Sequence, residues 1–292
     1  MTTVLAADAI VAEILADVAA REARVSFADI KALSRSVPSP RPVVSELLRP
    51  GCSIIAEIKR ANPVPHVHGG NDCVVHADAP RLLDFDAVSS LADVAGLAQG
   101  FAQAGVVAVA CQTEQLRFRG SLEDMATARA ASSVPMLCRD IIVDPYQVHE
   151  ARFFGADMVP LQVELLAQAR LVALVDRIES LGMTVLAEVR SPEQAQRAVA
   201  AGVKVVGINA RGLHSRHLNP HRFSAIVPHL PSDVVRIGLG GVVSAREVWR
   251  YAGWGADAVL VGEALMAAPR PAVLARDLVA AGLHPACPVW RS

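Results

Sequence analysis

Short apolar runs alternate with amphipathic segments from Ser53 to the end of the chain. The runs have the length of strands, and the segments between them, such as Leu166–Leu181 and Pro192–Ala201, have helical spacing. Eight strands that alternate with helices predict an all-parallel sheet, and eight is the number that closes a (β/α)8 TIM barrel. The predicted strands are Ser53–Lys59, Val106–Gln112, Val134–Arg139, Met158–Val163, Thr184–Val189, Val203–Asn209, Val234–Gly238 and Ala258–Val261.

A repeat of small residues supports closure of this sheet. It recurs about every fifty residues, the length of two βα units, and each copy ends a predicted helix and starts a strand. An open doubly wound sheet is the alternative, but no G-x-G-x-x-G follows the first strand. The copies are Ala104-Gly105-Val106, Gly155-Ala156-Asp157, Ala201-Gly202-Val203 and Gly255-Ala256-Asp257.

The first fifty residues have a different pattern. Val4–Arg21 and Phe27–Ser36 are predicted helices, with Ser26 as a candidate N-cap, and three prolines then separate them from the first strand. We therefore predict a single barrel domain over 1–292, in which 1–50 form a helical extension that covers the barrel floor.

A long polar segment, 61–86, follows the first strand, and we interpret it as a loop or insertion. It contains candidate metal ligands, but their spacing fits no standard site. We expect a solvated or substrate-covering loop, and no metal, although a metal site remains the alternative. The candidate ligands are His66, His68, Asp72, Cys73 and His76.

Composition and charge narrow the class of partner. The chain is 52% hydrophobic with a net charge of −1, and it has no long run of one charge sign. This balance gives no reason to expect nucleic acid or an anionic membrane as a partner. There is no apolar segment long enough to span a bilayer, no signal peptide, and no C-x-x-C among the five cysteines. We expect a cytoplasmic protein with reduced thiols and a small-molecule partner, present as a monomer or weak homo-oligomer.

Charged residues at the end of the first strand are the first sign of chemistry. Glu57 and Lys59 are two residues apart, so both side chains face the same side of the strand. Burying them in an apolar wall is costly unless they pair or react. A structural ion pair is the plainer explanation, but other predicted strands also end in polar residues.

Active sites of such barrels lie at the carboxyl ends of the strands, where these polar residues converge. Glycine-rich turns after the last two strands are typical of phosphate sites, although either could simply be a turn that needs a positive φ. The residues at these ends are Arg139, Asp140, Glu188, Asn209, Arg211, Gly240, Gly241, Gly262 and Glu263.

Several segments resemble the indole-3-glycerol phosphate synthase family, in the family's order and over nearly the whole chain. They are Ala56-Glu57-Ile58-Lys59-Arg60-Ala61, Phe118-Arg119-Gly120-Ser121-Leu122, Asp144-Pro145-Tyr146-Gln147, Leu186-Ala187-Glu188-Val189, Gly207-Ile208-Asn209-Ala210-Arg211 and Leu260-Val261-Gly262-Glu263-Ala264-Leu265-Met266. The resemblance implies a carbon–carbon lyase of tryptophan biosynthesis. It would close the pyrrole ring of carboxyphenylamino-deoxyribulose phosphate with loss of carbon dioxide and water, without a cofactor.

The resemblance also implies a role for each matching residue. Glu188 would be the general base, Lys59 would donate a proton or pair with a substrate anion, and Glu57 would orient Lys59. The expected catalytic set is Glu57, Lys59, Arg139, Glu188 and Asn209. The expected substrate-binding set is Arg60, Pro63, Phe118 and Arg211, and the phosphate-binding set is Lys59, Gly240, Gly241, Gly262 and Glu263.

The chain departs from the family pattern around the aromatic end of the substrate. Arg139 replaces a lysine that serves the family as general acid, and an arginine is a poor proton donor but a good oxyanion stabiliser. Ile141 stands in place of an aromatic wall residue, and Pro160 and Gln162 in place of aliphatic ones. Further departures are Asn62-Pro63-Val64-Pro65-His66, Leu239-Gly240-Gly241 and Ala264.

Three functions follow from these observations. The first is ring closure to indole-3-glycerol phosphate, and the second is a related reaction on a different amino-sugar phosphate in specialised metabolism. The third is a non-catalytic sugar-phosphate binder, which would lack a reaction that depends on Glu188.

Overall fold

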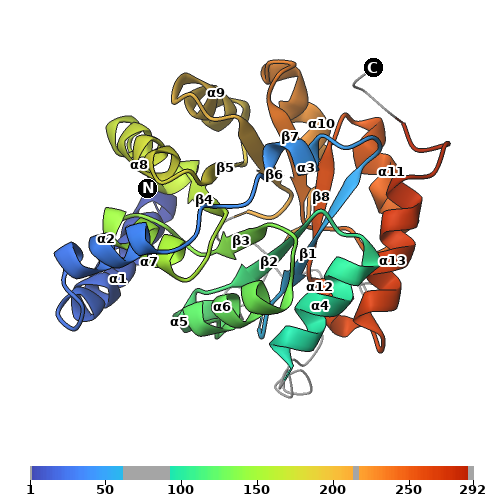
Figure 1. Ribbon diagram of the computed structural model, residues 1–292. Helices are drawn as coiled ribbons and strands as arrows, with labels where there is room; N and C mark the ends of the chain where they lie inside the picture. Colours follow the sequence, from blue (N-terminus) through green and yellow to red (C-terminus); the bar gives the residue numbers. More distant parts are fainter. Residues whose placement is uncertain (1, 62–92, 213–216, 289–292) are drawn as a thin grey trace, which may run out of the picture.

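The computed structural model describes residues 2–61, 93–212 and 217–288, with the side chains of 2–6 excluded. Its parallel strands form a closed barrel in the order β1 to β8, surrounded by helices (Figure 1). This confirms the predicted fold. The strands are β1 Ser53–Ile58, β2 Ala108–Gln112, β3 Met136–Arg139, β4 Met158–Gln162, β5 Thr184–Val189, β6 Val205–Asn209, β7 Val235–Leu239 and β8 Ala258–Val261.

Helices follow the strands around the outside of the barrel. The longer ones are α4 Val94–Ala104, α6 Leu122–Ala131, α7 Pro145–Phe153, α8 Gln168–Ser180, α9 Pro192–Ala200, α10 His221–Ile226, α11 Ala245–Gly253 and α13 Pro271–Gly282. Shorter elements are α5 Gln115–Phe118, α12 Glu263–Ala267 and the 3-10 turns η2 Val163–Leu165 and η3 Val227–His229. None of the helices in the described part of the chain has the length and hydropathy to cross a bilayer.

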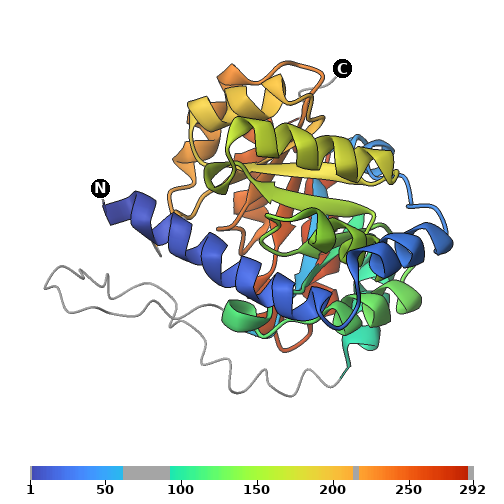
Figure 2. The same ribbon diagram turned by 90° about the vertical axis from the view of Figure 1, so that its left-hand side faces the viewer.

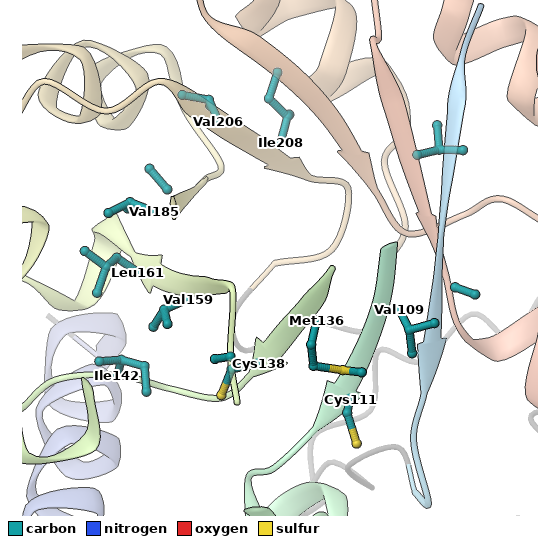
Figure 3. Close-up of a cluster of buried hydrophobic side chains, with 14 of the residues drawn as sticks. Val109, Cys111, Met136, Cys138, Ile142, Val159, Leu161, Val185, Val206 and Ile208 are labelled. Atoms are coloured by element: carbon teal, nitrogen blue, oxygen red, sulfur yellow. The ribbon is translucent and has the colours of Figure 1, made fainter. Parts of the chain in front are cut away.

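Strand alternation divides the apolar residues into two cores. One core fills the barrel interior and includes Ile55, Leu137 and Leu186. The other lies between the strands and the helices, and Figure 3 shows part of it around Cys111 and Cys138. Each strand is therefore buried on both faces, which explains why the predicted strands are nearly continuous apolar runs.

The repeated small residues have the predicted role in the turns into the strands. Gly105, Gly155, Gly202 and Gly255 all have a positive φ, between 83° and 97°. Glycine adopts this left-handed conformation without a steric penalty, so it ends the helix and redirects the chain into the next strand.

The N-terminal helices are α1 Thr2–Glu22, α2 Phe27–Ser36 and α3 Val44–Leu47. Ser26 caps α2 as predicted, because its hydroxyl accepts from the Asp29 amide at 3.2 Å. The barrel floor is covered by α3, whose Leu47 is fully buried against the inner core. The expectation that the long helices cover the floor is wrong for α1, which packs along α7 and η2 on the side of the strand ends (Figure 2).

Ion pairs that the sequence pattern does not reveal join α1 to its neighbours, in addition to the packing of its buried Ile14 and Val18. Arg21 of α1 donates to Glu150 of α7, and Glu13 of α1 accepts from Arg117 of α5. Both partners belong to elements near the carboxyl ends of β2 and β3. The segment predicted as an insertion, 61–86, lies outside the described residues except for Ala61.

Candidate active site

Strand alternation points one set of charged side chains into the mouth of the barrel. Glu57 lies two residues beyond Ile55, and Arg139 and Glu188 lie two residues beyond Leu137 and Leu186, all three of which belong to the inner core. Residues two apart share a face of a strand, so these charged groups cap the inner core. Glu57 is 5% exposed and Glu188 is 1% exposed.

Arg139 joins the two buried carboxylates. Its Nε lies 3.2 Å from Oε1 of Glu57, and its Nη1 donates to Oε1 of Glu188. Asn209 contacts the other oxygen of Glu188, with Nδ2 3.3 Å from Oε2. A planar guanidinium with several donors suits this bridging position, which a single ammonium would not fill in the same way.

Lys59 lies next to this cluster and is itself buried. Its Nζ is 3.6 Å from Oε2 of Glu57 and 3.9 Å from Oε1 of Glu263. Glu263 also accepts from Arg211 at 2.7 Å. The predicted residues of β1, β3, β5, β6 and β8 therefore form one connected network of charged and polar groups.

The charges around Glu57 determine its protonation state. Burial pushes the pKa of this carboxyl upward, but the neighbouring Lys59 and Arg139 outweigh burial, and the pKa is lowered. Glu57 is thus a carboxylate at neutral pH, and its negative charge faces the Lys59 ammonium.

Gly262 has a packing role that the sequence did not reveal. A Cβ at this position would lie 2.1 Å from Oε2 of Glu57, so any larger residue would displace the carboxylate. Gly240 and Gly241 have φ values of 88° and 78°, and among the described residues a Cβ on Gly240 would meet Leu218 alone, at 3.9 Å. Among the described residues Gly240 thus has space for a side chain, whereas Gly262 leaves room for Glu57.

Three predicted substrate-binding residues lie outside this network. Arg60 forms a two-pronged pair with Asp124 of α6, at 2.6 and 2.7 Å. Phe118 ends the short helix α5 and is half-buried. Pro63 lies outside the described residues, so its predicted contact with the substrate stays a prediction.

Polar residues beyond the predicted set also support the mouth. Arg222 donates to the backbone oxygen of Asn209 at 2.8 Å, and Arg190 donates to that of Arg211 at 3.0 Å. Gln112 and Gln162 end β2 and β4 on the inner face, in phase with Ala110 and Met158 of the inner core. Continuing the two-residue alternation of each predicted strand would have identified both glutamines.

A metal site has no support within the described residues, where no group of three or more metal-ligand side chains occurs. The candidate ligands between His66 and His76 lie outside them.

Solved structures with a similar fold support the barrel assignment only. Thiamine phosphate pyrophosphorylase from Pyrococcus furiosus superposes with a TM-score of 0.55 at 15% identity, covering 80% of this chain and 95% of that chain. The N-acetylmannosamine-6-phosphate 2-epimerase from Clostridium perfringens has a TM-score of 0.55 at 16% identity, covering 78% and 93%.

Sequence comparison is more specific. The family model "Indole-3-glycerol phosphate synthase" matches residues 85–278. The indole-3-glycerol phosphate synthase of Mycobacterium tuberculosis H37Rv is 45% identical over 281 residues, which is 96% of each chain. That of Mycobacterium avium is 44% identical with the same coverage. The chain belongs to the indole-3-glycerol phosphate synthase family.

Proposed function

We propose that this chain is a carboxy-lyase of tryptophan biosynthesis. It closes the ring of 1-(2-carboxyphenylamino)-1-deoxyribulose 5-phosphate and forms indole-3-glycerol phosphate, with loss of carbon dioxide and water. The observation that carries this proposal is the buried network of Glu57, Arg139 and Glu188 in a member of this family. Two carboxylates and their cations at a barrel mouth provide the base and the positive charge that the reaction needs.

The phosphate of the substrate binds near the ends of β7 and β8 in this proposal. Two features support this placement: the positive φ of Gly240 and Gly241, and the general location of phosphate sites after the last two barrel strands. Lys59 and Arg211 both contact Glu263, which lies just after β8, and they supply positive charge there. The side chain of Glu263 is negatively charged, as phosphate is, so its role is to hold these two cations and not to contact the phosphate.

The carbonyl oxygen of the sugar chain gains negative charge when the aryl carbon attacks the ketone. Arg139 stabilises that charge electrostatically, because a guanidinium stays protonated and does not release its proton. Lys59 is then the proton donor that expels the hydroxyl group as water, since an ammonium, unlike a guanidinium, can release a proton. Glu57 holds the Lys59 ammonium in place at 3.6 Å.

After carbon dioxide leaves, Glu188 removes a proton from the ring carbon or nitrogen. The loss of this proton makes the new ring aromatic. Its 1% exposure keeps water away from this carboxylate, and Asn209 orients it. We further propose that the protein acts in the cytoplasm, because the four cysteines of the described chain are free and buried. As part of the same proposal, it acts as a monomer or weak homo-oligomer.

The test is a fluorescence assay for indole formation from the purified protein and the carboxyphenylamino-deoxyribulose phosphate. Turnover at an enzyme-like rate, which Glu188→Gln abolishes, supports the proposal. Absence of indole contradicts it, even if inorganic phosphate still raises the melting temperature, because binding would then occur without ring closure.

A further inference from the structure

Gln162 is a buried polar residue of the barrel mouth to which the reaction above gives no role. It ends β4 on the inner face, in phase with Met158 of the inner core, and pairs in register with Glu188. Its exposure is only 6%. The residue two positions earlier on the same face is Pro160, so no other polar side chain of β4 accompanies it.

The orientation of the Gln162 amide is fixed by the one hydrogen bond that its side chain makes within the described part of the chain. Nε2 donates to the backbone oxygen of Asp140 at 2.9 Å, and a carbonyl oxygen accepts only, so the nitrogen must lie on that side. Oε1 is then the remaining group, and it has no hydrogen-bond partner among the described residues. Buried acceptors in proteins are nearly always paired, and an unpaired one is unfavourable.

The position of Gln162 around the barrel indicates which part of the substrate it meets. In the closed order β1 to β8, strand β4 lies across the barrel from β8, where the phosphate is placed. The phosphate and the arylamine are attached at opposite ends of the sugar chain. A substrate with its phosphate near Gly240 and its ketone near Arg139 therefore directs its aryl ring towards β4.

We propose that the aryl ring of this protein's substrate carries a hydrogen-bond donor, a hydroxyl or an amino group, that pairs with Oε1 of Gln162. This inference rests on the proposed function and narrows its substrate class to ring-substituted arylamino-deoxyribulose phosphates. A ring without the donor leaves the buried acceptor unpaired, and sites of this kind discriminate strongly against the analogue that lacks the group.

The test compares kcat/KM for the unsubstituted substrate with that for each positional isomer that carries one ring hydroxyl. The wild-type protein should prefer one hydroxylated isomer by on the order of tenfold or more. Gln162→Met, which is close in shape but has no acceptor, and Gln162→Leu should reverse or remove that preference. Gln196→Leu, on the exposed side of α9, is the matched control and should keep it.

Two results would overturn the inference, and they differ from each other. If the wild-type protein turns over the unsubstituted substrate as well as every isomer, and Gln162→Met changes no ratio, water serves Oε1 and the inference is wrong while the proposed function stands. If neither the unsubstituted substrate nor any isomer is turned over, the proposed function is itself wrong, and the inference fails with it.

Discussion

The Nε atom of Arg139 lies 3.2 Å from Oε1 of Glu57, which ties the end of β3 to the end of β1 across the intervening strand β2. The same guanidinium donates to Glu188 on β5. One side chain thus holds two carboxylates that, without it, would repel each other in a buried site. The relative placement of the two carboxylates therefore depends on this cation.

Replacing Arg139 separates its two roles, charge stabilisation and bridging. Arg139→Lys keeps the positive charge, but its single ammonium cannot bridge both carboxylates in the same way, so we expect the rate of indole formation to fall by roughly tenfold. Arg139→Gln removes the charge and should lose at least that much activity. Initial rates from indole fluorescence measure both effects. If Arg139→Lys is as active as the wild-type protein, the reaction does not need the guanidinium to bridge the two carboxylates.

Glu188→Gln tests the general base. The amide keeps an oxygen that accepts from Arg139 but cannot take up a proton, so kcat should fall by about 10²- to 10⁴-fold while the fold is retained. Steady-state kinetics and the melting temperature measure the two properties. Glu179→Gln, on the exposed side of α8, is the matched control and should leave kcat unchanged. If the Glu188→Gln protein has wild-type activity, Glu188 is not the general base.

Gly262→Ala tests the packing of β8 against Glu57. The φ of Gly262 is −125°, which alanine tolerates, so the effect comes from the Cβ, 2.1 Å from the carboxylate oxygen. Displacing Glu57 should lower kcat/KM by on the order of tenfold and the free energy of unfolding by about 1–3 kcal/mol. Kinetics and urea denaturation measure these values. In the control Gly253→Ala the nearest atom to the new Cβ is Pro288 Cγ at 3.9 Å, so activity should not change.

Glu150 makes the stability of the protein depend on pH. Burial raises the pKa of this carboxyl to about 7 despite its ion pair with Arg21. The unfolded chain has a glutamate pKa near 4.3, so the folded state binds this proton more tightly. Its contribution to stability is therefore fully present below about pH 4, and it is lost as the pH rises towards 7.

Glu150→Gln should remove part of that loss, on the order of 1 kcal/mol of unfolding free energy between pH 5 and pH 7.5. Urea denaturation at the two pH values measures it. Asp140, whose pKa burial raises to about 6, contributes in the same direction and should leave a residual slope. An unchanged slope in Glu150→Gln would show that Glu150 does not titrate in this range.

The strand pattern of the sequence was sufficient to predict the barrel and the shared face of Glu57 and Lys59. It placed the starts of β2, β3 and β6 two residues too early, because apolar residues such as Val106 are buried before the strand begins. A run of apolar residues shows that a segment is buried, but it does not show at which residue the pairing with a neighbouring strand begins. The network around Arg139 could not be predicted from the sequence alone, because its members are far apart along the chain and meet only in the folded barrel.

The position of α1 was not predictable for a related reason. Its contacts include the Arg21–Glu150 and Glu13–Arg117 pairs, which join residues far apart in sequence. Nothing in the local pattern of α1 indicates which end of the barrel it meets. The unpaired acceptor of Gln162 is likewise a property of its surroundings, since the sequence shows only a polar residue at the end of a strand.

The stoichiometry of the reaction tests the proposed function most directly. Purified protein and carboxyphenylamino-deoxyribulose phosphate, or its preferred hydroxylated isomer, should yield carbon dioxide and indole product in equal amounts. Glu188→Gln should suppress both products together. If the wild-type protein releases neither product from any of these compounds, it is not a ring-closing carboxy-lyase and the central claim is wrong.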